Sequence, residues 1–260
     1  MLLLNIQSSP RGAKSASIAV TNAFLDAYQA LHSDAMIDTL NVWEENLPDF
    51  DSEAIGAKYK GVSHKPMSAA EAEIWERIQT LAKRFQRADR IVLGVPMWNF
   101  AFPYKLKQLI DLACQRNFLF TFANGVFGPL LKTPRALVVY TRGQTYSEDS
   151  PTPPTRFDHQ TAYINFWLHF IGVQQVETVI VENTWSDNAE ENIARGQNEA
   201  RNHAASFSSY LLSKYCGLIK AVRSLDFQND YGWTAEARLY GGRVQPRRRS
   251  GEDGQIVPCG

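Results

Sequence analysis

The chain has 260 residues, of which 44% are hydrophobic, and its 27 basic residues balance its 27 acidic ones. This length supports a substantial core in one or two domains, and the neutral charge argues against nucleic acid or an anionic membrane as the main partner. The three cysteines, Cys114, Cys216 and Cys259, fit neither a disulfide framework nor a metal site. No apolar run resembles a signal peptide or a membrane span, so we expect a cytoplasmic protein.

Strand and helix patterns alternate along the chain. Short apolar runs predict buried strands at residues 2–6, 35–40, 91–95, 136–140 and 176–181. Apolar residues at helical spacing predict helices at residues 17–31, 68–85, 105–114, 162–171 and 189–212, the second opened by a Ser68–Glu71 capping box. The alternation predicts a doubly wound α/β fold with strand order 2-1-3-4-5 and a ligand at the carboxyl ends of the first, third and fourth strands.

Two segments fall outside this pattern. Residues 44–67 form a polar connection that contains Pro and Gly, and its length marks it as a candidate functional loop. Residues 214–260 show little periodicity and contain three consecutive arginines at 247–249. We therefore expect one domain over residues 1–213 and a peripheral or poorly ordered tail over 214–260.

The connection between the first strand and the first helix is rich in hydroxyl groups. A strand that leads through a turn into a helix directs backbone N–H groups and the helix dipole at one point. Ser9, Ser15 and Ser17 add donors there, and Arg11 and Lys14 add positive charge. The connection lacks both glycine-rich nucleotide motifs, which favours a terminal monophosphate such as that of flavin mononucleotide (FMN). The alternative is that Ser15 or Ser17 only caps the helix.

A second loop follows the third strand. Pro96 ends that strand, because proline cannot donate to the ladder. Met97, Trp98 and Phe100 then supply apolar surface, and Asn99 supplies an amide. A flavin ring needs a flat apolar wall and hydrogen bonds at its pyrimidine edge, so this loop is a candidate wall. The alternative is an apolar loop packed under a neighbouring helix.

A third loop follows the fourth strand and reads Thr141-Arg142-Gly143-Gln144, with Tyr146 two residues on. Gly143 permits a close backbone approach or a positive φ, and the surrounding donors suit negative charge on a flavin ring. The alternative is a solvated turn.

Together these stretches resemble the FMN-dependent NADH azoreductases, which belong to the flavodoxin-like NAD(P)H:quinone oxidoreductases. The matching stretches are Ser8-Ser9-Pro10-Arg11 with Ser15-Ala16-Ser17, Pro96-Met97-Trp98-Asn99-Phe100 through Asp111, and Thr141-Arg142-Gly143. The resemblance covers about residues 1–210. It implies a flavodoxin-like three-layer fold, non-covalent FMN, NADH or NADPH as electron donor, and ping-pong transfer of two electrons to a quinone or azo compound.

The resemblance also implies which residues bind the cofactor and that a second subunit completes the site. The predicted cofactor-binding residues are Ser9, Arg11, Ser15, Ala16, Ser17, Pro96, Met97, Trp98, Asn99, Phe100, Thr141, Arg142, Gly143, Gln144 and Tyr146. A homodimer is implied, with residues 44–67 and Phe118, Phe120 and Phe122 as candidates for the substrate wall given to the other subunit. Trp98, Asn117 and Gln144 depart from the family's usual Tyr, Gly and Gly.

No side chain is needed as nucleophile or acid–base catalyst, because the flavin carries the chemistry. A flavodoxin-type electron carrier that serves a protein partner is the alternative function, and a flavin-free interaction module is a third. The acceptor and the choice between NADH and NADPH stay open.

Overall fold

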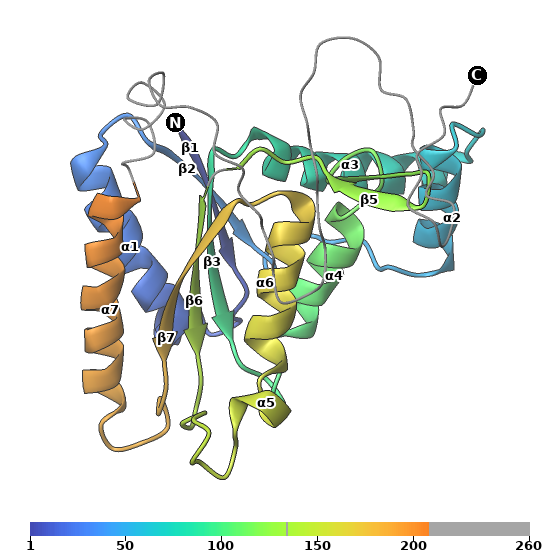
Figure 1. The fold of residues 1–260 in the computed structure, drawn as a ribbon. Coiled ribbons are helices and arrows are strands. Elements are labelled where there is room, and N and C mark those ends of the chain that lie inside the picture. The colour runs from blue at the N-terminus through green and yellow to red at the C-terminus, as the bar shows by residue number, and fades with distance from the viewer. Residues whose placement is uncertain (134, 208–260) are drawn as a thin grey trace, which may run out of the picture. The chain divides into compact units, whose positions relative to one another are not determined.

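The computed structural model describes residues 1–207 except residue 134, so the predicted tail over 214–260 lies outside the described residues. A five-stranded parallel sheet with the order β2-β1-β3-β6-β7 lies at the centre (Figure 1). Its strands are β1 (Leu2–Gln7), β2 (Met36–Asn41), β3 (Arg90–Pro96), β6 (Arg135–Thr141) and β7 (Gln175–Val181). β6 and β7 are the fourth and fifth strands of this sheet along the chain, so the predicted order is confirmed.

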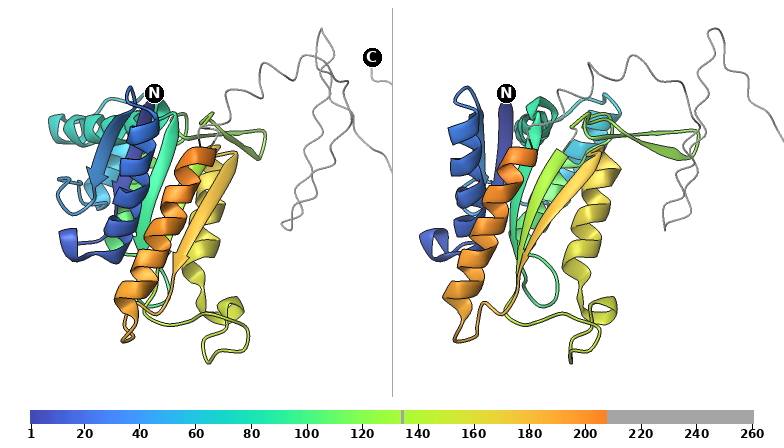
Figure 2. Two further views of the ribbon diagram at one scale, coloured as in Figure 1. Left: turned by 90° about the vertical axis from the view of Figure 1, so that its left-hand side faces the viewer. Right: turned by 60° about the vertical axis from the view of Figure 1, so that its left-hand side comes forward.

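Helices cover both faces of the sheet. α1 (Ala16–Leu31) and α7 (Ala189–Ser206) lie side by side on one face, and α3 (Ala69–Arg87), α4 (Tyr104–Ala113) and α6 (His159–Ile171) lie on the other (Figures 1 and 2). Each face has its own hydrophobic core. The inner strands β3 and β6 are buried along their length because both of their faces are covered. None of the helices within residues 1–207 is long and apolar enough to cross a membrane.

Polar caps fix where the helices begin. The predicted capping box is confirmed at α3, where the Ser68 hydroxyl and the Glu71 carboxylate each accept the other residue's backbone N–H. α6 begins three residues earlier than predicted, because the Asp158 carboxylate accepts the N–H groups of Gln160 and Thr161. α7 follows its predicted course to Ser206, and the predicted end at residue 212 lies outside the described residues.

The connection over residues 44–67 is not an irregular loop, because it contains α2 (Ser52–Val62). The buried face of α2 consists of small residues, Ala54, Ala57 and Gly61. A Cβ on Gly61 would lie 2.2 Å from the indole of Trp75, so α2 packs against α3 through close approach rather than through large side chains. A helix of this kind leaves no large-apolar periodicity in the sequence.

Four short elements were also not predicted. They are the 3₁₀ helix η1 (Gly12–Lys14), the hairpin strands β4 (Phe120–Ala123) and β5 (Val126–Pro129), and α5 (Pro154–Phe157). The hairpin turn is Asn124-Gly125, with both residues at positive φ. Asn-Gly between apolar runs is a strong hairpin signal, so this element was readable in the sequence.

Candidate functional site

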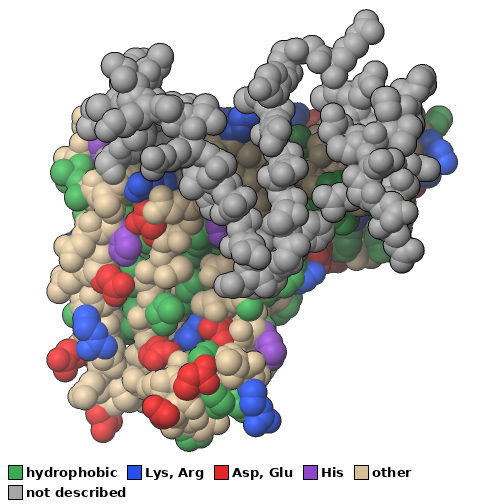
Figure 3. Space-filling view, in the orientation of Figure 1, with side chains coloured by type: hydrophobic (Ala, Val, Ile, Leu, Met, Phe, Trp, Pro, Cys, Tyr) green, Lys and Arg blue, Asp and Glu red, His purple; other side chains and the backbone are tan. Residues whose placement is uncertain are grey.

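The three predicted loops meet at the carboxyl edge of the sheet, the lower end in Figure 1. The backbone N–H and the hydroxyl of Ser8 both donate to the Gly94 carbonyl, at 3.3 and 2.7 Å. The N–H of Met97 donates to the Thr141 carbonyl at 2.8 Å. The ends of β1, β3 and β6 are therefore tied to one another. Hydrophobic and charged side chains are exposed together at this end of the molecule (Figure 3).

The first loop presents buried hydroxyls at the start of α1. Ser15 is the N-cap, as the alternative interpretation expects, and its hydroxyl lies 3.5 Å from the Ile18 N–H and 3.1 Å from the Ser17 hydroxyl. Ser9 is also buried. The N–H groups of Ala16 and Ser17 lie in the first helical turn, where no acceptor exists within the helix. Capping and anion binding are thus compatible here, and the arrangement suits a phosphate.

The second loop is a strained two-residue turn. Trp98 and Ala101 exchange two backbone hydrogen bonds of 3.0 and 2.9 Å, and the residues between them, Asn99 and Phe100, have φ of 46° and 69°. Positive φ at both central positions defines a type I′ turn, and a phenylalanine there is costly. Trp98 and Phe100 are 37% and 42% exposed, so this turn leaves apolar surface open at the carboxyl edge of the sheet.

Trp43, which follows β2, links the first two loops and was not predicted. Its indole N–H donates to the Ser8 carbonyl at 2.9 Å. Its ring lies 5.7 Å from the ring of Trp98 and 5.4 Å from that of Tyr104. The sequence did contain a signal for this role, because Trp43 is a large aromatic residue in an otherwise polar segment just after a strand.

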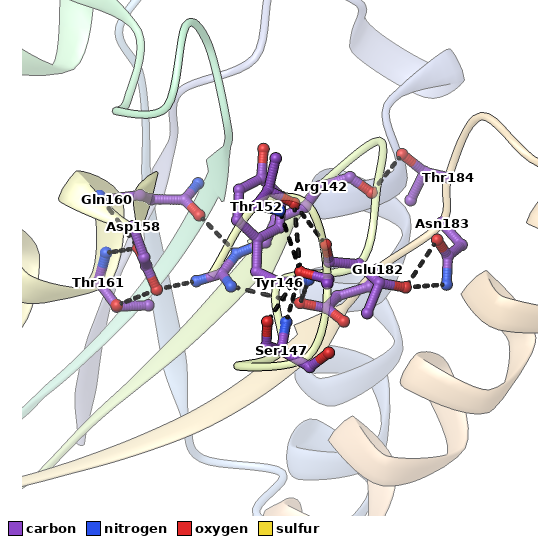
Figure 4. A network of polar contacts seen from close by, with 12 residues as sticks. Arg142, Tyr146, Ser147, Thr152, Asp158, Gln160, Thr161, Glu182, Asn183 and Thr184 are labelled. Carbon is purple, nitrogen blue, oxygen red and sulfur yellow. Dashed lines mark hydrogen bonds and ion pairs between the residues drawn. The ribbon is translucent and has the colours of Figure 1, made fainter. Parts of the chain in front are cut away.

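The third loop contains a buried arginine that points into the protein. Arg142 is 3% exposed and pairs with Asp158 at 2.5 Å and Glu182 at 3.4 Å. Its Nε donates to the Gln160 side chain at 3.2 Å. Figure 4 shows the guanidinium directed toward the start of α6, away from Thr184. The predicted contact of Arg142 with a flavin stays a prediction.

Tyr146 lies against this arginine. Its ring is 5.1 Å from the Arg142 guanidinium, and its backbone N–H donates to Glu182 at 3.0 Å. Burial raises the pKa of Tyr146, Arg142 opposes that rise, and the carboxylates of Asp158 and Glu182 add to it. The phenol therefore keeps its proton near neutral pH and is able to donate a hydrogen bond.

Gly143 makes room for an indole. A Cβ at this position would lie 2.3 Å from the ring of Trp185, so the close approach expected at Gly143 is made by this residue of the loop after β7. Trp185 is 78% exposed. The N–H and hydroxyl of Thr184 fix the loop on the Arg142 carbonyl, at 3.0 and 2.9 Å. Sequence reasoning missed Trp185, which follows the fifth strand in a polar stretch.

The three predicted pocket phenylalanines contact parts of their own chain other than the three loops. The ring of Phe118 packs on Trp75, and that of Phe120 packs on Phe170 near the end of α6. Phe122 lies on the hairpin with them. The turn at residues 98–101 lies instead at the beginning of α6, since the N–H of His159 donates to the Phe100 carbonyl at 3.1 Å.

Comparisons with known proteins agree with this fold. Residues 1–204 match the model of a protein family whose members share a flavodoxin-like fold. The chain is 60% identical over 207 residues to FMN-dependent NADH:quinone oxidoreductase 2 of Burkholderia lata, a match that covers 80% of this chain and 100% of that protein. It is 40% identical over 208 residues to the protein of the same name from Pseudomonas syringae pv. tomato, covering 79% and 98%. The crystal structure of azoreductase from Bacillus anthracis str. Sterne, 25% identical, superposes with a TM-score of 0.73 over 80% of this chain and 100% of that one.

Proposed function

The chain belongs to the FMN-dependent NADH:quinone oxidoreductases of the flavodoxin-like fold, and on that premise we propose that it works by a ping-pong route at the carboxyl edge of the sheet, where its three loops meet. It is an FMN-dependent oxidoreductase that takes electrons from NADH and acts on quinones or azo compounds. When bound, FMN supplies the two-electron chemistry. The residues of the chain bind, orient and shield it.

The start of α1 carries this proposal. Buried hydroxyls of Ser9, Ser15 and Ser17 surround a helix N-terminus whose first N–H groups have no acceptor within the helix. Three phosphate oxygens can be satisfied by such hydroxyl and N–H donors without a glycine-rich loop. Arg11 and Lys14 lie exposed beside them and add positive potential.

The strained turn supplies the proposed wall for the ring. Trp98 and Phe100 offer apolar area, and the Asn99 amide stands between them for the polar edge of the ring. The backbone of Gly143 and Gln144 and the protonated Tyr146 phenol would offer donors from the neighbouring strand end. NADH and the acceptor would use this aromatic slot in turn.

We propose a homodimer in which the hairpin of one subunit completes the slot of the other. Phe122 and Phe127 of the hairpin and Phe166 of α6 are 38%, 51% and 55% exposed. Their rings form one cluster with Phe120 and Phe170. Exposed apolar area of this extent is typical of a protein interface. We call these five residues the aromatic patch.

Two steps of anaerobic spectroscopy test the reaction. NADH added alone to the FMN-loaded protein should bleach the visible flavin absorption, and a quinone added afterwards should restore it. Bleaching that requires the acceptor to be present would contradict a ping-pong route. A protein that fails to bind FMN would contradict the function itself.

A further inference from the structure

We propose that Arg142 is a positioning residue that, through Gln160 and Asp158, holds the strained turn at residues 98–101 in place. The inference rests on the proposed function, because that turn is the proposed wall for the flavin ring. It assigns a role to two residues of the α6 start that neither the sequence pattern nor the comparisons single out.

Gln160 is the first link. Its side chain is completely buried, its Oε1 accepts from Arg142 Nε at 3.2 Å, and its Nε2 donates to the Val95 carbonyl at 2.9 Å. Val95 directly precedes Pro96, the last residue of β3 before the loop. One amide therefore joins the end of β6 to the end of β3. The oxygen and the nitrogen of this amide each make one of these hydrogen bonds. Replacing Gln160 by an apolar side chain therefore removes both hydrogen bonds and changes no charge.

Asp158 is the second link. Its Oδ2 pairs with Arg142 at 2.5 Å, and its Oδ1 caps α6 through the N–H groups of Gln160 and Thr161 (Figure 4). The residue between, His159, donates its N–H to the Phe100 carbonyl at 3.1 Å. The ion pair thus fixes the start of α6, and the start of α6 fixes the turn.

The turn requires such support. Phe100 has φ of 69°, a conformation that a bulky side chain adopts only where its surroundings enforce it. The Phe100 carbonyl is held by His159, and its ring lies 5.2 Å from that of Phe157. Both contacts come from the segment that Arg142 anchors. Loss of the anchor should let the turn relax and move Trp98 and Asn99 relative to the ring site.

The other end of the same strand provides a matched control. Arg135 begins β6 and pairs with Glu177 of β7 at 3.1 Å, with side chains 13% and 11% exposed. Arg142 follows the end of β6 and also pairs with a glutamate that follows β7. The two arginines are therefore similar in burial and pairing, but only Arg142 reaches the site.

The experiment compares Arg142→Gln, Gln160→Met and Arg135→Gln in the full chain. Amide exchange at residues 98–101, measured on the apoprotein, should accelerate about tenfold in the first two variants, the effect of losing one buried hydrogen bond. In the FMN-loaded protein the same two variants should share a changed visible circular dichroism band. Their kcat at saturating NADH should fall on the order of tenfold to a hundredfold. Arg135→Gln should lose stability and leave all three readouts at their wild-type values.

Two results would overturn the proposal. If Gln160→Met behaves as wild type while Arg142→Gln is impaired, Arg142 acts by direct contact. If Arg135→Gln reproduces the changes, they report general destabilisation. Should Arg142→Gln fail to fold, the exchange rates of Gln160→Met alone test the proposal. Wild-type rates at residues 98–101 in that variant would mean that Gln160 does not hold the turn. Those rates need no cofactor, so a failure of the proposed function would be visible separately, as a wild-type protein that binds no FMN.

Discussion

Gly61 and Gly143 each face an indole at the point where a Cβ would lie, at 2.2 and 2.3 Å. The two indoles differ in how far they can move, because Trp75 is buried in the core whereas Trp185 is largely exposed. We expect Gly61→Ala to destabilise the protein by about 1–3 kcal/mol, the usual cost of overpacking. Gly143→Ala should cost less than about 1 kcal/mol, since Trp185 can turn into solvent. Chemical denaturation measures both.

Tryptophan fluorescence distinguishes the two responses. A shift of emission in Gly143→Ala that is absent from a Gly143→Ala/Trp185→Phe double variant would assign the movement to Trp185. Equal losses of stability in the two single variants would contradict the argument, because they would mean that Trp185 is as confined as Trp75.

Cys114 is a thiol whose reactivity should be suppressed by its surroundings. Burial raises the pKa of this thiol to about 11, so at pH 8 its thiolate fraction is on the order of a hundredfold below that of an ordinary cysteine. Alkylation by iodoacetamide, followed by peptide mapping so that only Cys114 is read, should be slower than in the denatured protein by that factor and should accelerate up to about pH 11. A rate independent of pH between 8 and 10 would contradict the assigned pKa.

At the scale of elements, the N-terminus of α1 combines capping with proposed phosphate binding. Substitutions of the N-cap residue Ser15 can distinguish the two roles. Ser15→Ala removes the cap and should cost about 1 kcal/mol of stability. Ser15→Asp keeps a good cap but places a carboxylate next to the proposed phosphate. We expect it to retain the stability of the wild type while weakening FMN binding at least about tenfold by charge repulsion. Denaturation and FMN titration measure the two effects.

α3 supplies the control for this prediction. Ser68 caps it in the same way and belongs to a different part of the fold from the three loops. Ser68→Ala should lower stability by a similar amount and leave FMN binding unchanged. If Ser15→Asp binds FMN as tightly as the wild type, Ser15 is a cap and nothing more.

The elements that the sequence revealed are those whose burial leaves a regular pattern. The inner strands appear as continuous apolar runs, and α3 shows both a capping box and an apolar stripe. α2 was missed because its packing depends on Gly61 and two alanines, which carry no hydrophobic period. The hairpin was missed although Asn124-Gly125 marks its turn. The early start of α6 depends on Asp158, whose capping role is local chemistry rather than periodicity.

At the scale of the whole molecule, the convergence of three loops was predictable because parallel strands end at one edge of the sheet. The contacts between the loops were not. Trp43, Asp158 and Gln160 reach the loops from segments remote in sequence. Such partners depend on how helices and loops sit on the sheet, which no single stretch of sequence encodes. The same reason hid the inward direction of Arg142.

The proposed dimer is a property of the whole molecule and is tested by its surface. Phe166→Lys places a charge in the aromatic patch, where burial against a second copy would desolvate it. We expect this variant to be a monomer by size-exclusion chromatography with light scattering, whereas the wild type is a dimer. Met36→Lys is the control, because Met36 is also exposed but lies on the edge strand β2, at a position outside the patch.

Activity then shows whether the second copy completes the slot. The Phe166→Lys monomer should still bind FMN, since the phosphate donors of Ser9, Ser15 and Ser17 belong to one chain, but its quinone turnover should fall on the order of a hundredfold as the acceptor loses one wall. A wild-type protein that is monomeric at micromolar concentration would contradict the dimer. A monomeric variant with full turnover would instead show that each slot is complete within one chain, and the phenylalanines of the hairpin would then serve association alone.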